Sequence, residues 1–439
     1  MTAPLLNPPE TVRAIAAELE SAGFETWCVG GAIRDALLGH RHLDWDLATV
    51  AHPEQVRKLF RRTIPVGIEY GTVGVVDSKN VMHEVTTFRR DIRTDGRHAV
   101  VEFGASLEED LARRDFTINA IAYSPSRNEI ADPFGGKSDL DSGILRAVGD
   151  ARQRMTEDRL RALRGIRFAS RFDFKIDSAT WAAIVESGQH LSRLSPERIK
   201  QEIEKTMEQV RFPSRAFQMW MDSGAFATLI PELAGIDASS LVALDCLPLP
   251  GLPGGPQRKT TRVAALFALV PAAESARILR RLRFSNAEIG WISMLIDRWQ
   301  ALGAEMTRAL LTERSPDDAT LRRWAAAAGR TRLAPLIRLA SAFWSCDRAG
   351  GKPAPESRRV RSAYRRAIRI AYRDPIEVAD LAIDGDDLTK AGITGPAVGT
   401  TLRSLLESVI QNPQVNTREQ LMGLIVARDG AAKPNLNPT

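Results

Sequence analysis

The sequence contains only three cysteines, Cys28, Cys246 and Cys346, which lie far apart and lack the spacing of a metal site. This number and spacing exclude a disulfide framework and favour a reducing compartment. No run of residues is long and apolar enough to span a membrane. The N-terminus also lacks the basic region followed by an apolar core that is typical of a signal peptide. We therefore expect a cytoplasmic protein without a membrane segment.

The remaining composition is that of an ordinary globular protein. Apolar side chains make up 44% of the residues and charged side chains 26%. A chain of 439 residues is long enough for about one to four domains with a sizeable core. The formal net charge of +6 mildly favours a polyanionic partner such as a nucleic acid.

The most informative segment is residues 28–50, with the sequence CVGGAIRDALLGHRHLDWDLATV. It predicts a strand, a tight turn at Gly30-Gly31 and a short helix that ends at Gly39. The backbone N–H groups of the turn and the start of the helix suit a triphosphate. Arg34, one turn into the helix, can add a charge-assisted hydrogen bond to the same phosphates.

Two carboxylates, Asp44 and Asp46, follow on a second strand that is predicted over residues 44–47. Alternate residues of a strand share a face, so both carboxylates point the same way. Two neighbouring carboxylates suit Mg²⁺, and like charges this close repel unless a cation lies between them. A pair of carboxylates like Asp44 and Asp46 alone is more often solvated, and a Gly-Gly turn alone is more often an ordinary turn. Their combination in this order favours a metal-dependent nucleotide site.

This segment resembles the nucleotide-binding signature of the class II tRNA nucleotidyltransferases, the CCA-adding enzymes and their bacterial poly(A) polymerase relatives. In that family the GGxxRD and D-x-D motifs belong to a polymerase-β-like head. The resemblance implies that Asp44 and Asp46 are catalytic and hold Mg²⁺. It also implies that Gly30, Gly31 and Arg34 bind the incoming nucleotide.

The resemblance covers the chain nearly end to end and predicts its architecture. We expect an α+β fold in which a nucleotidyltransferase head, built from a small mixed sheet with helices, is followed by helical parts only. The predicted parts are a catalytic head over residues 1–145, a neck for base selection over 146–215, a body over 216–350 and a tRNA-binding tail over 351–439.

Two strands predicted over GTVGVVD and NVMHEVTTF bring a further carboxylate, Glu84, into the head. The resemblance implies a third catalytic carboxylate on a strand beside Asp44 and Asp46, and Glu84 is the candidate. An ordinary exposed strand glutamate is an equally good interpretation. The polar and basic segment 89–104 is predicted to be a mobile loop beside the site, which in the family helps the switch from C to A addition.

Residues 106–123, SLEEDLARRDFTINAIAY, begin with a capping-box pattern of Ser106 and Glu109 that predicts the start of a helix. The following run resembles the family's RRDFTxNA motif. The resemblance implies that Arg114 binds the triphosphate, and that Asp115 positions Arg114 or the ribose. The alternative is a purely structural role, in which Asp115 only packs against the arginines at the end of this helix.

A single helix capped by Thr156 is predicted over residues 155–172. This segment resembles the family's EDxxR motif, which implies nucleotide binding by its polar side chains. Most of them fall within about a third of the helix circumference, with the last one off that face. These residues are Glu157, Asp158, Arg161, Arg164 and, off the face, Arg167.

The chemistry of Asp158 and Arg161 fits the selection of two bases. Cytosine and adenine each show a donor beside an acceptor along one edge, whereas uracil and guanine show the reverse order. An acceptor at Asp158 beside a donor at Arg161 therefore fits C and A and rejects U and G without a nucleic-acid template. The alternative is a solvated helix with i,i+4 pairs such as Glu157–Arg161. A later pair, Arg198 and Glu202, has the same spacing and is expected to support the neck helices.

The C-terminal half is predicted to be helical. Residues 352–373 carry eight Lys or Arg and one acid with two interleaved tyrosines, which makes either a phosphate-binding face or a solvated helix. Residues 380–421 resemble the family's tail, and in the family the body and tail grip the acceptor and TΨC arm of tRNA. All six histidines lie at or before His190, which excludes a downstream phosphohydrolase domain of the histidine-dependent HD type.

The resemblance implies addition of CCA to the tRNA 3′ end from CTP and ATP, with attack of the 3′-hydroxyl on the α-phosphate and release of pyrophosphate. An A-adding enzyme or a poly(A) polymerase of the same family is the first alternative. A non-catalytic tRNA-binding protein of this fold is the second, although such a protein would need neither Asp44, Asp46 nor Arg34. The sequence does not specify an oligomeric state.

Overall fold

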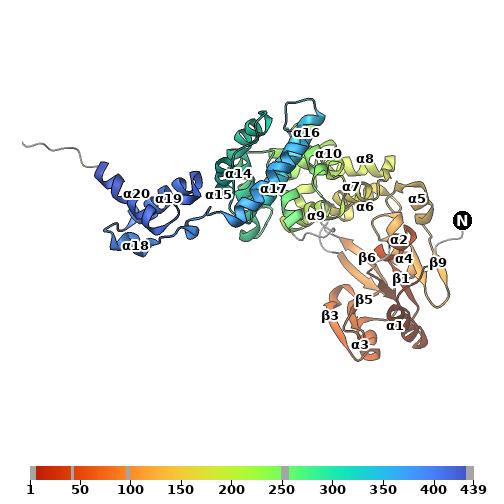
Figure 1. Ribbon diagram of the computed structural model, residues 1–439. Helices are drawn as coiled ribbons and strands as arrows, with labels where there is room; N and C mark the ends of the chain where they lie inside the picture. Colours follow the sequence, from red (N-terminus) through yellow and green to blue (C-terminus); the bar gives the residue numbers. More distant parts are fainter. Residues whose placement is uncertain (1–5, 41–43, 95–98, 249–256, 432–439) are drawn as a thin grey trace, which may run out of the picture. The chain divides into compact units, whose positions relative to one another are not determined.

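The computed structural model describes residues 6–40, 44–94, 99–248 and 257–431 (Figure 1). The chain forms two compact units, an N-terminal unit, Met1–Gly235, and a C-terminal unit, Ile236–Thr439. The N-terminal unit combines strands with helices, and every element described beyond Gly235 is helical. The predicted α+β class is therefore confirmed.

The N-terminal unit is built on a seven-stranded sheet of order β3-β4-β5-β2-β1-β8-β9. The β2–β5 pair is parallel and the other pairs are antiparallel, so the sheet is mixed, as predicted. Its strands are β1 (Thr26–Val29), β2 (Asp46–Thr49), β3 (Thr63–Gly67), β4 (Thr72–Val76), β5 (Met82–Thr87), β8 (Ala122–Ser124) and β9 (Glu129–Ala131).

Helices of one to three turns surround this sheet. They begin where the sequence supplies a cap or a proline: Ser106 and Glu109 form the predicted capping box of α4, and Pro53 is the first residue of α3. The helices of this part are α1 (Glu10–Ser21), α2 (Gly31–Leu37), α3 (Pro53–Leu59), α4 (Leu107–Ala112) and α5 (Gly136–Ser142), with 3₁₀ turns η1 (Ile68–Tyr70) and η2 (Thr117–Asn119).

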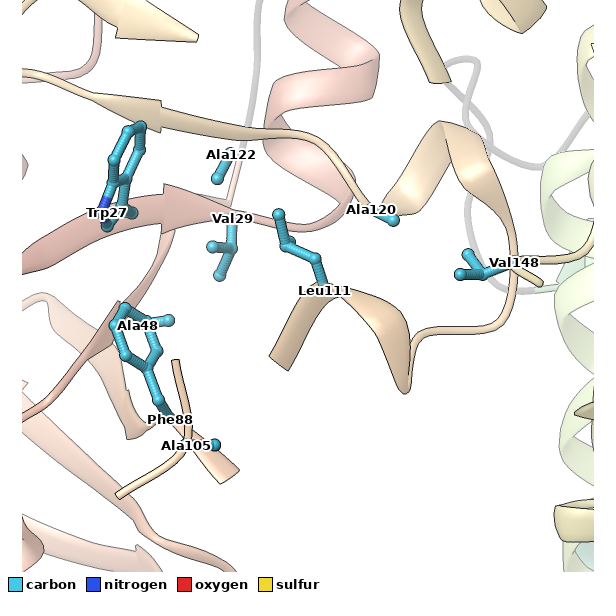
Figure 2. Close-up of a cluster of buried hydrophobic side chains, with 9 residues drawn as sticks. All are labelled: Trp27, Val29, Ala48, Phe88, Ala105, Leu111, Ala120, Ala122 and Val148. Atoms are coloured by element: carbon cyan, nitrogen blue, oxygen red, sulfur yellow. The ribbon is translucent and has the colours of Figure 1, made fainter. Parts of the chain in front are cut away.

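A hydrophobic cluster on one face of the sheet supports the predicted site (Figure 2). Phe88 and Leu111 are fully buried in it, and each contributes about 1.5–3 kcal/mol by leaving water. The register places Val29 opposite Asp46, so the first residue of β2 sits at the border of this cluster. Packing of the apolar residues thus fixes the strand end that carries the carboxylate.

Residues 89–104 differ from the predicted mobile loop. They form an antiparallel pair of strands, β6 (Arg89–Thr94) and β7 (Ala99–Phe103). The run AVVEF has the β-branched residues of a strand, and the polar, basic composition of the segment hid this signal. The Asp95-Gly96 turn signal lies outside the described residues.

The predicted single helix over residues 155–172 is wrong, because the chain breaks at Asp158. Asp158 has an extended backbone (φ −147°, ψ 105°) and separates α6 (Ala151–Glu157) from α7 (Leu160–Phe172). Its Oδ1 accepts a hydrogen bond of 3.0 Å from the Leu160 N–H, in competition with helix continuation. Thr156 lies inside α6 and donates to the Arg152 carbonyl, whereas Asp150 caps that helix.

More helices complete the N-terminal unit. Pro196 is the first residue of α9, a position that favours proline. The short parallel pair β10 (Ile144–Leu145) and β11 (Lys175–Ile176) lies beside α7. The remaining elements are α8 (Ser178–Gly188), η3 (Leu191–Arg193), α9 (Pro196–Gln209), α10 (Pro213–Asp222), α11 (Ala225–Leu229) and η4 (Pro231–Leu233).

The C-terminal unit is all-helical in the part that the structure describes, and no described helix is long and apolar enough to cross a membrane. Its last helices share a separate hydrophobic cluster around Leu388, Leu405 and Leu421. The elements are η5 (Ala238–Cys246), α12 (Gln257–Phe267), α13 (Ala272–Arg281), α14 (Asn286–Leu311), α15 (Asp318–Ala328), α16 (Leu333–Ala349), α17 (Ser357–Arg373), η6 (Val378–Asp380), α18 (Gly385–Lys390), α19 (Pro396–Gln411), η7 (Pro413–Val415) and α20 (Arg418–Ala431).

Candidate active site

A polar cavity of about 450 Å³ in the N-terminal unit brings the three sequence motifs together. The turn before α2, the start of β2, the segment after α4 and the helix α7 all contribute side chains to it. Its lining residues are Gly30, Gly31, Arg34, Asp46, Arg113, Arg114, Asp115, Asn119, Asp158, Arg161, Arg164 and Phe168. The volume is in the range of ligand pockets.

Gly30 lies between the guanidinium of Arg114 and the carboxylate of Asp46. Its φ of +80° is a conformation that other residues rarely adopt. A Cβ atom there would lie 3.3 Å from Arg114 Nη1 and 3.8 Å from Asp46 Oδ2. The absent side chain therefore leaves open space where an anionic group can approach both Arg114 and the backbone.

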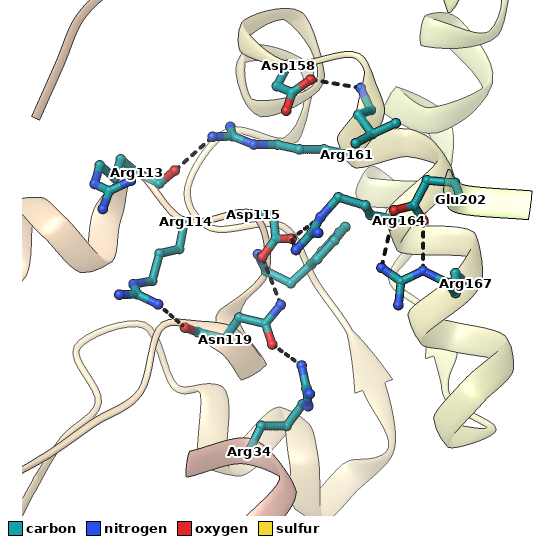
Figure 3. A network of polar contacts seen from close by, with 12 residues as sticks. Arg34, Arg113, Arg114, Asp115, Asn119, Asp158, Arg161, Arg164, Arg167 and Glu202 are labelled. Carbon is teal, nitrogen blue, oxygen red and sulfur yellow. Dashed lines mark hydrogen bonds and ion pairs between the residues drawn. The ribbon is translucent and has the colours of Figure 1, made fainter. Parts of the chain in front are cut away.

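Arg34 is almost completely buried and fixed on several sides (Figure 3). Its Nε donates to Asp35 Oδ1 at 2.7 Å and its Nη1 donates to Asn119 Oδ1 at 2.5 Å. The guanidinium carbon also lies 5.1 Å from the ring centre of Phe168 and 4.8 Å from that of Phe172. Arg34 is thus a preorganised positive charge at the cavity wall.

Asp110, which sequence reasoning missed, holds both arginines of the second motif. This carboxylate is 1% exposed and accepts hydrogen bonds from Arg113 Nη2 at 2.7 Å and from Arg114 Nη2 at 3.2 Å. The i,i+4 spacing of Asp110 and Arg114 was the available signal. The buried Nε of Arg114 has no hydrogen-bond partner among the described residues.

Asp115 contacts Arg164 rather than Arg114. Its Oδ2 accepts from Arg164 Nε at 2.9 Å and Nη2 at 2.7 Å, and its Oδ1 accepts from Asn119 at 2.8 Å. Burial alone would raise the pKa of Asp115, but the Arg164 charge and these hydrogen bonds outweigh it and lower the pKa to about 2. Asp115 is therefore ionised and links Arg164 of α7 to Asn119, which in turn accepts a hydrogen bond from Arg34.

Asp158, at the break between α6 and α7, and Arg161, in the first turn of α7, both line the cavity. Asp158 Oδ2 accepts from Arg198 Nη2 at 2.7 Å. Arg161 donates to Glu157 Oε2 at 2.8 Å and to the Arg113 carbonyl at 2.8 Å. The i,i+4 pair that was the alternative interpretation is present, and Arg161 nevertheless lines the cavity.

Two other residues of the neck prediction lie elsewhere. Glu157 is not among the lining residues and pairs with Arg154 and Arg161. Arg167 is buried against Glu202 at 2.7 Å, outside the cavity lining. Arg198 and Glu202, both of α9, therefore form separate ion pairs with Asp158, just before α7, and with Arg167 of α7.

The three predicted carboxylates lie at one end of the sheet. Asp46 is the first residue of β2, whereas Asp44 is exposed and precedes the strand that was predicted to include it. The parallel register pairs Leu47 with Val85, which places Glu84 beside Asp46 on the neighbouring strand. Neither Asp44 nor Glu84 is among the residues that line the cavity.

The electrostatics of this cluster fit a cation. Burial, together with the negative charges of Glu84 and Asp44, raises the pKa of Asp46 to about 6, and the positive charge of Arg114 partly opposes this rise. A divalent cation would relieve this repulsion. The described residues contain no group of three or more His, Cys, Asp or Glu arranged to hold a metal ion, so a role for Glu84 beside Asp44 and Asp46 stays a prediction.

The mixed sheet, the Gly30-Gly31 turn and the cavity-lining arginines beside Asp46 together fit a nucleotidyltransferase head. The family model described as "Poly A polymerase head domain" matches residues 26–146, and "Probable RNA and SrmB- binding site of polymerase A" matches residues 173–236. The solved Bacillus stearothermophilus CCA-adding enzyme in complex with CTP is 30% identical, with a TM-score of 0.77 over 98% of this chain and 100% of that one. The chain belongs to the class II CCA-adding enzyme and poly(A) polymerase family.

Curated relatives share about half of this chain. A CCA-adding enzyme of Streptococcus suis is 43% identical over 223 residues, 50% of this chain and 54% of that protein. One of Enterococcus faecalis is 48% identical over 195 residues, 43% of this chain and 47% of that protein. The chain thus spans about half the length of these curated relatives in the matches. The Thermotoga maritima CCA-adding enzyme complexed with tRNA has the same fold, with a TM-score of 0.68 at 20% identity.

Proposed function

We propose that this chain is a template-independent tRNA nucleotidyltransferase that adds CCA to the tRNA 3′ end from CTP and ATP and releases pyrophosphate. One observation carries the proposal: a single cavity joins phosphate-facing arginines, Asp46 and the Asp158–Arg161 pair. The similarity to the CTP complex of a solved relative and to curated CCA-adding enzymes supports it. The free thiols of the three cysteines suit the reducing cytoplasm.

The triphosphate would bind between Gly30-Gly31, Arg34 and Arg114. Arg34 is held by Asp35 and Asn119, and Arg114 by Asp110, so neither side chain loses much rotamer freedom when a phosphate binds. Positioning and charge complementarity supply most of the catalysis in such phosphoryl chemistry.

Asp44 and Asp46 would hold Mg²⁺, which when bound activates the RNA 3′-hydroxyl and neutralises charge on the leaving group. The raised pKa of Asp46 supports a cation at this point. Glu84, beside Asp46 on β5, is the residue we assign as third carboxylate. Strand β5 lies on the other side of β2 from β1, which precedes Gly30. Glu84 is therefore well placed to orient the attacking hydroxyl.

Base selection would rest on Asp158 and Arg161. Arg198 and the Leu160 N–H each donate to one oxygen of Asp158, and Arg161 donates to Glu157 and to the carbonyls of Arg113 and Arg154. Asp158 keeps free lone pairs and Arg161 keeps free N–H groups, since each has more hydrogen-bonding capacity than these partners use. The pair therefore offers an acceptor beside a donor, the order that cytosine and adenine match. Arg164, fixed by Asp115, adds a positive charge next to this pair.

The C-terminal unit supplies a face for the RNA backbone. Helix α17 buries Val360, Ala367 and Ile370 and exposes arginines at i, i+3 and i+4 spacing on another side. These are Arg358, Arg361, Arg365, Arg369 and Arg373, accompanied by Tyr372, which is 60% exposed. Such a stripe suits phosphates of the tRNA arm. We propose the division into head (1–145), neck (146–215), body (216–350) and tail (351–439) from the family resemblance, and α17 lies in the tail of this division.

Extension of a tRNA transcript that lacks CCA, with Mg²⁺ and CTP, ATP or both, tests the proposal when the new 3′ ends are sequenced. We expect CC with CTP alone and CCA with both. Asp46→Asn should abolish extension, whereas Asp141→Asn, an exposed aspartate in α5, should not. Addition of A only to tRNA ending in CC, or long A tails, would instead identify an A-adding enzyme or a poly(A) polymerase. Full extension by Asp46→Asn would contradict the catalytic assignment.

A further inference from the structure

An exposed apolar surface lies on the sheet close to the carboxylates. Ile64 and Val66 of β3 are 46% and 42% exposed, and Met82 of β5 is 41% exposed. Large apolar side chains that are scattered singly need no explanation, but a contiguous group of them marks an interaction site. We refer to Ile64, Val66 and Met82 as the apolar shelf.

The apolar shelf belongs to the same face of the sheet as the carboxylates. The register pairs Gly74 of β4 with both Ile64 and Glu84, so these three residues share one face. Met82 lies two residues before Glu84 on β5 and therefore points to that face as well. Glu84 in turn neighbours Asp46, so the shelf continues directly from the carboxylate cluster.

Gly74 explains how the shelf becomes continuous. A Cβ atom at this position would lie 2.7 Å from Met82 Sδ and 3.0 Å from Val66 Cγ2. The side chains of Met82 and Val66 therefore converge from the two flanking strands over the bare backbone of Gly74. A larger residue at position 74 would push them apart and divide the surface.

The order of the strands indicates on which side of the reacting phosphate the apolar shelf lies. Gly30, where the phosphates would bind, follows β1, and Asp46 begins β2. Beyond β2 the sheet continues through β5 and β4 to β3, away from β1 (Figure 1). In an in-line transfer the leaving pyrophosphate and the attacking oxygen lie on opposite sides of the reacting phosphate. The attacking hydroxyl therefore comes from the β5 side, where the shelf lies.

We propose that the apolar shelf binds the sugar and base of the 3′-terminal nucleotide of the RNA that is being extended. The proposal rests on the nucleotidyltransferase function proposed above. The terminal base of such an RNA changes after each addition, and a hydrogen-bonding site would favour one base over the others. Contact with an apolar surface tolerates any base, because every base has an apolar face.

The variants Val66→Ser and Met82→Ser test this inference. We expect each to raise the KM for tRNA lacking CCA about fivefold through lost apolar contact, with the KM for CTP unchanged. The increase should be similar for tRNA ending in its own last base, in C or in CC. Val185→Ser in α8 is the matched control, since Val185 is equally exposed at 41% and lies outside the sheet. Thermal melting of each variant verifies the fold.

The outcomes are distinguishable. If the wild-type chain extends tRNA and both shelf variants keep its tRNA KM, the inference is wrong. If the variants keep that KM but change the oligomeric state in sedimentation, the shelf is a protein interface and the inference is again wrong. If the wild-type chain does not extend tRNA at all, the proposed function itself fails, and this is established before any variant is compared.

Discussion

Replacement of Asp115 by asparagine removes the negative charge at the centre of the network in Figure 3. Asp115 is 8% exposed and accepts two hydrogen bonds from Arg164 and one from Asn119. The variant Asp115→Asn keeps the size of the side chain but leaves the Arg164 guanidinium without its counter-charge. We expect the N-terminal unit to lose stability and the cavity to lose the fixed position of Arg164.

The size of the expected loss of stability follows from the pKa of Asp115. A pKa of about 2 in the folded protein, against an ordinary value of about 3.9, corresponds to about 2.5 kcal/mol of stability at pH 7. Because the folded pKa is lowered, this contribution is complete above pH 5 and is lost as the pH falls through about 2. About half of it, about 1.3 kcal/mol, remains at pH 3.

Hydrogen exchange of the α7 amides, measured by mass spectrometry, reports the free energy of opening of this part of the chain. The difference between wild type and Asp115→Asn should be about 2–3 kcal/mol at pH 7 and about half as large at pH 3. Asp141→Asn should show no difference at either pH. A difference below about 0.5 kcal/mol at pH 7, or one that grows toward low pH, would refute the reasoning.

Three further predictions concern the phosphate end of the cavity. Gly30→Ala should lower kcat by about a hundredfold or more, because a Cβ meets Arg114 and φ is positive; steady-state extension kinetics measure it, and unchanged kcat would contradict it. Asp110→Asn should raise the KM for CTP about tenfold by releasing Arg113 and Arg114; equal KM values in both proteins would exclude this role. Mg²⁺ binding, followed by calorimetry, should weaken about tenfold from pH 7 to pH 5 as Asp46 takes up a proton; pH-independent binding would argue against Asp46 as a ligand.

Sequence reasoning predicted the features that depend on short-range rules. The Gly30-Gly31 turn, the helix that ends before Gly39 and the capping box of Ser106 follow from local backbone chemistry, and the structure contains them. The helical C-terminal half follows from periodicity and composition. The joining of three distant motifs in one cavity came from family resemblance rather than from residue patterns, since spacing alone does not bring residues 30, 114 and 161 together.

The differences between the predicted and the observed structure have causes that the sequence pattern does not show. Helical periodicity continues across Asp158, so only the competing side-chain bond to Leu160 reveals the break. The buried pair of Arg167 and Glu202 lies 35 residues apart along the chain, and no local pattern announces it. The role of Asp110 depends on its burial beneath two arginines, which the sequence does not specify.

The most direct test of the account is single-nucleotide incorporation on tRNA lacking CCA, with CTP, ATP, UTP or GTP supplied separately to wild type and Asp158→Ala. The wild-type chain should use CTP at the first position and reject UTP and GTP. In Asp158→Ala the ratio of kcat/KM for CTP over UTP should fall at least about tenfold, because the acceptor that matches the cytosine amino group is gone. Strict rejection of UTP by this variant, at reduced but measurable activity, would contradict base reading by the Asp158–Arg161 pair.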